Sequence, residues 1–266
     1  MALYRQSLLK SAVEGTLTAE WRGNESTSAW SSATIGDLAE VGTGVTPLRS
    51  NSRYFGGGTI PWVTSGALNA ALVTAGSEFV TEAAVAECRL KLYPPGTLLV
   101  AMYGEGKTRG KCSELAVAAT INQAIAAIVL KPAFEKCRAF LKAFLWHSYE
   151  SMRQQASGGV QPNLNLQIVK SISVPLPPLD EQQEIVRRLD TLLDAATVQE
   201  EALDRALAMV AAQRQNILRA AFSGQLVPQD PNDEPASVLL ERIRAQRNAA
   251  ADKPAARRPR KAKIAA

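Results

Sequence analysis

The sequence has few of the residues from which most catalytic and metal sites are built. It contains one histidine, His147, and three cysteines, Cys88, Cys112 and Cys137. A Ser-His-Asp triad or a multi-histidine metal site would depend on that single histidine, so neither is expected. The cysteines are odd in number and more than twenty residues apart, which suits neither a disulfide framework nor a zinc knuckle. We expect free thiols in a reducing cytoplasm and no bound metal.

Membrane and export signals are also missing. No apolar run approaches the roughly 20 residues that a membrane-spanning helix needs. The stretch from Met1 to Lys10 lacks a basic region followed by an apolar segment and a small-residue cleavage site. Hydrophobic residues make up 46% of the chain and charged residues 21%, as in ordinary globular proteins. These features predict a cytoplasmic protein without membrane contact.

The net charge of +5 is unevenly distributed. Residues 30–178 carry a net charge of +4, residues 179–222 carry −3, and residues 223–266 carry +4. A basic globular part beside an acidic helical one is compatible with a phosphate-facing surface and a separate structural element. Charge alone does not establish nucleic-acid binding, because many soluble proteins of this charge bind none.

The pattern of the sequence predicts an α+β protein, with a globular mixed α/β domain followed by a long coiled-coil helix. Strands are expected at 59–63, 97–102 and 124–130, with turn residues between them, and a helix at 134–151. An earlier helix should end near Gly15, a C-cap that follows apolar residues at helical spacing. The apolar residues of that first helix are Leu8, Leu9, Ala12 and Val13.

The long helix carries the strongest periodic signal in the chain. Residues 175–178, Pro-Leu-Pro-Pro, cannot be helical, and Asp180 is a suitable N-cap before Glu181 and Glu184 in the first turn. The helix should run to about Phe222 and stop at Gly224. Nine of eleven positions in its heptad seam are apolar, which favours a coiled coil over a helix lying on the domain. The seam consists of Ile185, Leu189, Leu192, Ala196, Gln199, Leu203, Ala206, Val210, Gln213, Ile217 and Ala220.

The chain contains an internal repeat. The run from Arg5 to Leu17 matches the run from Arg214 to Leu226, with Arg, Gln, the second Leu, Ala, Gly and the last Leu in common. The chain therefore begins with the end of a helical unit and later contains the complete unit.

These features together resemble the specificity subunit of type I restriction–modification systems. Residues 174–190 are similar to the start of the conserved helix of that family, and residues 214–243 are similar to its end. Landmarks inside the domain match at 60–68, 96–104, 121–124 and 161–165. The resemblance covers about residues 5–245, but the chain has one recognition domain where the family has two. It is therefore either the second half of a longer subunit or a short form that pairs with itself as a homodimer.

The resemblance implies a division into four regions and a set of partners. The regions are an N-terminal helical segment and linker (1–28), a target-recognition domain (29–178), a long conserved helix (179–224) and a helical segment with a disordered basic tail (225–266). The partners are double-stranded DNA, methyltransferase (modification) subunits and a restriction subunit. S-adenosylmethionine and ATP belong to those subunits, so this chain is expected to have no catalytic residues and no cofactor of its own.

Two functions other than DNA recognition are compatible with parts of the sequence. One is a coiled-coil adaptor that binds proteins and has no DNA specificity. The other is an ATPase, because residues 101–108 resemble a relaxed phosphate-binding loop. The strict pattern requires glycine at Ala101, and Gly110 is a poor start for the helix that must follow. We interpret Lys107, Arg109 and Lys111 instead as phosphate contacts on a glycine-rich loop.

Three polar loops, 46–54, 103–111 and 154–163, offer side chains of the kinds that read base edges in the major groove. Trp62 and Trp146 are expected in the core. The Asn122-Gln123 pair either contacts bases or buttresses a loop. The candidate DNA contacts are Arg49, Asn51 and Arg53 in the first loop; Tyr103, Lys107, Thr108, Arg109 and Lys111 in the second; and Ser157, Gln161 and Asn163 in the third.

Overall fold

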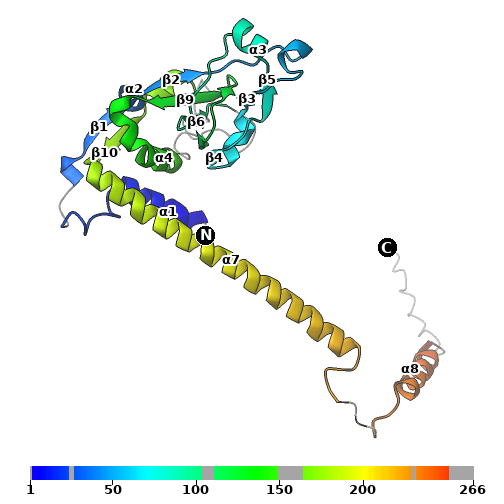
Figure 1. Ribbon diagram of the computed structural model, residues 1–266. Coiled ribbons are helices and arrows are strands. Elements are labelled where there is room, and N and C mark those ends of the chain that lie inside the picture. Colours follow the sequence, from blue (N-terminus) through cyan, green and yellow to red (C-terminus); the bar gives the residue numbers. More distant parts are fainter. Residues whose placement is uncertain are drawn as a thin grey trace, which may run out of the picture. The chain divides into compact units, whose positions relative to one another are not determined.

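The computed structural model describes residues 2–23, 27–103, 111–148, 164–228, 230 and 232–251. The chain divides into two compact units, Met1–Glu201 and Ala202–Ala266. The first unit holds the N-terminal helix α1 (Ala2–Val13), a mixed α/β domain and the beginning of the long helix (Figure 1). The fold is therefore the expected α+β one.

A five-stranded sheet forms the centre of the first unit. Its strand order is β2-β9-β6-β7-β4, and every pairing is antiparallel except that of β4 with β7. The central strands β9 and β6 are almost entirely buried, which agrees with their continuous apolar sequences. These strands confirm the expected ones at 97–102 and 124–130. The bounds are β2 Ala39–Thr43, β4 Leu72–Val73, β6 Leu98–Ala101, β7 Cys112–Leu115 and β9 Ile125–Leu130.

A smaller sheet of order β5-β3-β8 carries its own apolar cluster. Strand β3 (Ile60–Val63) is the strand expected at 59–63, and it pairs with β5 (Glu78–Val80) and β8 (Thr120–Ile121). The helix α3 (Glu82–Glu87) follows β5. Trp62 is only 1% exposed, so its expected core position is confirmed.

Helix α4 (Arg138–His147) packs one apolar face against the large sheet and the N-terminal helix. Its first turn, Pro132–Cys137, is a 3₁₀ helix (η4), so the helix expected from residue 134 is α-helical only from Arg138. The end expected at 151 lies outside the described residues. The buried residues of α4 are Phe140, Leu141, Ala143, Phe144 and Leu145.

A two-stranded antiparallel sheet joins the start of the mixed domain to its end. Strand β1 (Ser31–Thr34) pairs with β10 (Ser173–Leu176), and Pro175 lies opposite Ser32. A proline is tolerated here because both strands of a two-stranded sheet are edge strands, and an edge strand does not need every backbone N–H for pairing. The remaining short elements are η1 Thr27–Ala29, α2 Ile35–Leu38, η2 Ser52–Tyr54, η3 Ser65–Asn69 and α6 Leu166–Ser171.

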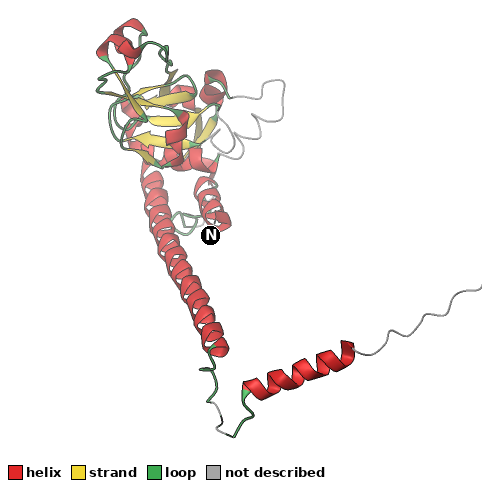
Figure 2. Ribbon diagram, turned by 90° about the vertical axis from the view of Figure 1, so that its right-hand side faces the viewer, coloured by secondary structure: helices red, strands yellow, loops and turns green. Residues whose placement is uncertain are grey.

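Helix α1 (Ala2–Val13) lies beside the long helix α7 (Leu179–Phe222), as both views show (Figures 1 and 2). Gly15, with a φ of +76°, ends the α1 segment as expected. Helix α7 begins one residue before Asp180, so Asp180 belongs to the first turn and the expected N-cap position is wrong. Its end at Phe222, two residues before Gly224, is as expected.

The expected seam of α7 has two environments. Ile185, Leu189 and Ala196 are 0%, 2% and 1% exposed, and Leu192 is half-buried against the same cluster. In the second unit, by contrast, Leu203, Val210 and Ile217 are 56%, 63% and 48% exposed. The second unit also contains helix α8 (Ala236–Ala251). Disorder is expected from Ala249 onward, but residues 249–251 belong to α8, so this part of the expectation is wrong. The rest of that tail, residues 252–266, lies outside the described residues.

Candidate nucleic-acid interface

The ends of the candidate DNA-contacting loops meet at one edge of the large sheet. Because β2 and β6 both run antiparallel to β9, their carboxyl ends lie beside the start of β9. The Met102 N–H donates to the Ala124 carbonyl at 2.8 Å, and the Leu164 N–H donates to the Met102 carbonyl at 3.1 Å. The third loop therefore ends next to the point where the second loop begins.

The first loop leaves β2 at this same edge through Gly44. A Cβ atom at Gly44 would lie 1.7 Å from the Ile121 carbonyl oxygen, so only glycine fits this approach. The Thr43 hydroxyl donates to the Ile125 carbonyl at 2.8 Å, and the Thr46 hydroxyl bonds the Gln123 side chain. Gln123 thus buttresses the first loop, one of the two roles considered for it.

The described ends of the second loop are already held by the protein. Tyr103 is half-buried, and burial raises the pKa of its phenol. The Lys111 ammonium donates to the Asn69 side-chain oxygen at 2.6 Å. The other candidate contacts of the second and third loops lie outside the described residues: Lys107, Thr108, Arg109, Ser157, Gln161 and Asn163.

Arg49 in the first loop is paired within the domain. Its two terminal nitrogens donate to the Glu78 carboxylate at 2.6 and 2.8 Å, and this pairing raises the pKa of Arg49. The guanidinium carbon also lies 5.3 Å from the Phe55 ring centre and 5.0 Å from that of Trp62. The two terminal nitrogens with which an arginine binds guanine are therefore both bonded to Glu78 in this structure.

The other two candidates of the first loop are likewise engaged. Arg53 forms a 3.1 Å ion pair with Glu87 of α3, and the Asn51 side chain accepts from the Arg53 backbone N–H at 3.1 Å. Glu87 also accepts from the Tyr54 hydroxyl at 3.0 Å. Sequence reasoning missed the two acidic partners, Glu78 and Glu87, because only the pairing of β5 with β3 brings them beside the loop.

The described residues that follow the 101–108 segment argue against an ATP-binding loop there. Such a loop must lead into a helix whose N-terminus holds the phosphates. Lys111 leads instead into strand β7, which returns antiparallel to β6. Residues 104–110 lie outside the described residues, but the described chain that follows them is a strand and not the helix that such a loop requires.

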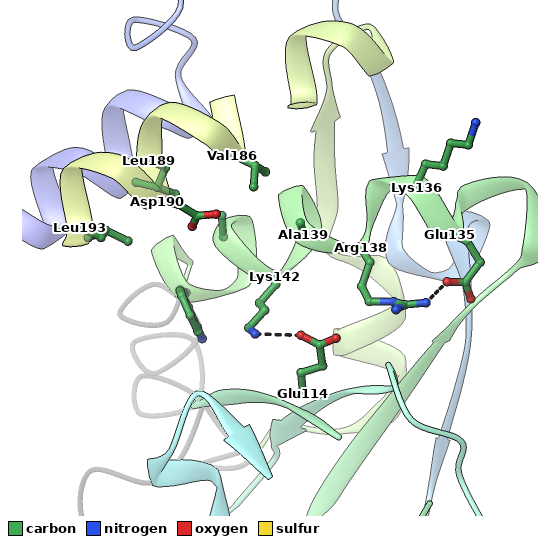
Figure 3. A pocket seen from close by; sticks show the side chains of 12 residues that line it. Glu114, Glu135, Lys136, Arg138, Ala139, Lys142, Val186, Leu189, Asp190 and Leu193 are labelled. Carbon is green, nitrogen blue, oxygen red and sulfur yellow. Dashed lines mark hydrogen bonds and ion pairs between the residues drawn. The ribbon is translucent and has the colours of Figure 1, made fainter. Parts of the chain in front are cut away.

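A cavity of about 380 Å³ lies between α4, β7 and the first part of α7, at the base of the mixed domain (Figure 3). The Lys142 ammonium, which lines the cavity, forms a 2.8 Å ion pair with the Glu114 carboxylate. The same ammonium lies 5.3 Å from the centre of the Trp146 ring. Trp146 donates its indole N–H to the Cys112 carbonyl at 3.1 Å, so it is a packing residue rather than a base-stacking platform. Arg138 is paired with Glu135 on the cavity rim. The candidate DNA contacts that the structure describes are all absent from the lining of this cavity: Arg49, Asn51, Arg53, Tyr103 and Lys111.

Among the residues that the structure describes, no group of His, Cys, Asp and Glu side chains is arranged to hold a metal ion. Within the same ranges, no helix is both long and apolar enough to cross a membrane.

Residues 27–206 match a family model described as the type I restriction modification DNA specificity domain. The matched range contains the mixed domain and the start of α7. All three candidate loops fall within it.

Curated relatives carry the same kind of description. The chain is 28% identical over 191 residues to the MjaIX specificity subunit of Methanocaldococcus jannaschii, covering 66% of this chain and 41% of that protein. It is 26% identical over 204 residues to the EcoR124I/EcoR124II specificity subunit of Escherichia coli, covering 73% and 46%. Over 107 residues it is 40% identical to the EcoDI specificity subunit of Escherichia coli, covering 37% and 24%. The chain spans less than half the length of each.

Solved structures with the same fold include the HsdS subunit from Thermoanaerobacter tengcongensis. That chain has a TM-score of 0.56 and 22% identity, over 84% of this chain and 53% of that one. A second, from work on complex assembly and conformational transition of the type I R-M system, has a TM-score of 0.60 and 21% identity, over 85% and 55%.

Proposed function

The chain belongs to the type I restriction–modification DNA specificity domain family, and we propose on this premise that it reads one half of a bipartite DNA site. The observation that carries the proposal is that the described ends of three polar loops meet at one edge of the central sheet. Loops held by a rigid sheet are suited to place side chains against base edges. Residues 29–178 are the proposed recognition domain, and the eleven loop residues named above are its candidate contacts.

The protein is proposed to act without catalysis of its own, as a specificity subunit. The relatives that it matches are named specificity subunits of restriction enzymes. Its expected partners are two methyltransferase subunits, which supply S-adenosylmethionine chemistry, and a restriction subunit that uses ATP. The cytoplasm is the proposed location, because the free thiols of Cys88, Cys112 and Cys137 would stay reduced there.

The long helix α7 is the proposed scaffold that joins this half to a second one. Its exposed seam residues Leu203, Val210 and Ile217 call for a partner helix, because an apolar stripe of this kind is unfavourable in water. A second copy of the chain would supply that helix and a second recognition domain. A larger subunit that contains this chain as its second half would supply it as well.

A salt-dependent gel shift of the chain assembled with its methyltransferase subunits tests DNA recognition. Binding through phosphate contacts should weaken steeply with salt, and one bipartite sequence should be preferred over a scrambled one. Mapping of methylated adenines with and without the gene then identifies the half-site. An assembled complex that binds no DNA at low salt would favour the adaptor function instead.

A further inference from the structure

Helix α1 occupies a defined face of α7. The Arg5 guanidinium donates to the Thr197 hydroxyl at 2.9 Å and to the Glu200 carboxylate at 3.2 Å. At the other end of the segment, Arg188 donates to the Leu17 carbonyl at 3.1 Å. The beginning of the N-terminal segment therefore lies beside residues 197–200 of α7, and its end lies beside residue 188. The two segments run antiparallel (Figure 1).

The contact covers apolar residues on both helices. Leu8 and Ala12 of α1 are 8% and 1% exposed, and they belong to the same buried cluster as Ile185 and Leu189 of α7. Leu9 and Val13 of α1 pack on the edge of that cluster. The α1 helix therefore shields the first part of the α7 seam from water.

The internal repeat provides a second copy of the α1 surface, and that copy is uncovered. At the shared offset, Leu8, Leu9 and Val13 correspond to Ile217, Leu218 and Phe222. These three side chains are 48%, 46% and 91% exposed. The backbone ends also correspond, because Gly15 has a φ of +76° and Gly224 has a φ of +72°.

We propose that the face of α7 covered by α1 is a docking site for residues 214–226 of a second copy of this chain, and that α1 is its intramolecular occupant. The inference rests on the proposed self-pairing and specifies its geometry. Arg214 of one copy would take the place of Arg5, beside Thr197 and Glu200 of the other. The same contact would form twice, related by a two-fold axis.

The α1 contacts also fix the register of the pair. If Arg214 lies beside Thr197 and Glu200 of an antiparallel partner, the two-fold axis passes close to Ala206. Leu203 then faces Val210 of the other copy, and Gln199 faces Gln213. Ala206 and the two facing pairs, Leu203–Val210 and Gln199–Gln213, all belong to the heptad seam of the sequence. A single register therefore pairs the seam of one copy with the seam of the other.

The chain that follows α1 can stay in place during such an exchange. Thr18, Arg22 and the Trp30 indole all bond the buried Glu181 carboxylate. At the repeat offset, Thr18 and Arg22 correspond to Val227 and Pro231, which cannot make these bonds. Only α1 itself has to leave, and it competes with the incoming helix end for the same face.

A matched pair of charge reversals tests the competition in the 266-residue chain. Arg5→Glu repels Glu200 and loosens α1, so it should lower the concentration needed for pairing by about fivefold. Arg214→Glu makes the same change in the incoming segment and should raise that concentration. Adding Glu200→Arg to Arg214→Glu should restore pairing, because the ion pair is rebuilt with its charges exchanged. The three variants, Arg5→Glu, Arg214→Glu and Arg214→Glu with Glu200→Arg, are compared with the unchanged chain by sedimentation.

Cysteine substitution tests the register. In a Cys88→Ala background, Ala206→Cys should be joined to its symmetry mate by a short thiol cross-linker, while Ala208→Cys, on the opposite face of the helix, should not. Cross-linking at Ala208 in place of Ala206, or charge reversals without effect on pairing, would overturn the inference and leave self-pairing intact. A chain that remains monomeric in every variant would overturn both, while the gel shift with methyltransferase subunits reports separately on DNA recognition.

Discussion

The hydroxyl of Thr18 donates a 2.7 Å hydrogen bond to the carboxylate of Glu181, a residue 163 positions later in the chain. The same carboxylate pairs with Arg22 and accepts from the Trp30 indole N–H at 2.8 Å. Glu181 is only 1% exposed, so these donors replace the water that a carboxylate would otherwise bind. The bond network fastens the beginning of α7 to the segment that precedes the mixed domain.

Removing the positive partner of this carboxylate should destabilise the protein. We expect Arg22→Ala to lower the free energy of unfolding by about 3 kcal/mol, because a buried charge then lacks its counter-charge. Adding Glu181→Gln should recover part of the loss, since the amide carries no charge. Urea denaturation of both variants measures the difference. Equal stability of the wild type and Arg22→Ala would mean that solvent reaches Glu181.

The basic side chains of the second loop should contribute to phosphate binding. We expect the triple substitution of Lys107, Arg109 and Lys111 by Ala to weaken DNA binding by the assembled complex. The slope of log K against log salt should flatten by at most about 0.9 for each lost phosphate contact. Gel shifts over a salt series give this slope, and an unchanged slope would locate the DNA surface elsewhere.

Glu78 should restrain Arg49 in the free protein. If Arg49 contacts DNA, its guanidinium must leave Glu78, and Glu78→Gln should then strengthen DNA binding severalfold at low salt. Arg49→Ala in the same background should remove the gain. The gel shift that compares Glu78→Gln with Glu82→Gln, a carboxylate for which no Arg49 contact is seen, controls for the change in net charge. No difference between these variants would assign Arg49 to packing alone.

The three thiols should differ in reactivity. Burial raises the pKa of Cys112 to about 12, and Cys137 is also buried, whereas Cys88 is partly exposed. At pH 8 a thiol-specific reagent should therefore label Cys88 first. The pKa of the Cys112 thiol is higher in the folded protein than its ordinary value of 9.0, so folding favours the neutral thiol. The free energy of unfolding should therefore be unaffected by this group below pH 9 and should fall as the pH rises toward 12. Rapid labelling of Cys112 in the folded protein at pH 8 would contradict its burial.

The length of α7 should set the spacer between the two half-sites. Deleting Gln199 to Ala202 removes about 6 Å of helix, and one base pair spans about 3.4 Å, so the spacer should shorten by one or two base pairs. A deletion of seven residues preserves the heptad register and should remove about three. The half-site bases should stay the same, because loops of a separate domain read them. Methylome sequencing of the deletion strains distinguishes an altered spacer from altered half-sites.

The sequence by itself determined the long helix and its seam. Proline at 175–178, the apolar heptads and Gly224 set local limits that need no tertiary contact, and α7 runs from Leu179 to Phe222. The strands β6 and β9 were equally accessible, since a continuous apolar run between turn residues reports burial directly. The family resemblance likewise rested on local runs of residues.

Only the tertiary structure decided which parts of those patterns are covered. Leu189 and Val210 occupy equivalent seam positions, yet α1 and the mixed domain bury the first while the second is 63% exposed. Arg49 and Arg53 are of the residue type that contacts DNA, yet in the structure they pair with Glu78 and Glu87. Both outcomes depend on residues distant in the chain, whose positions follow from strand pairing and helix packing. The sequence shows that an apolar side chain favours burial and that a charged one favours an opposite charge. The tertiary structure determines which residue is the partner.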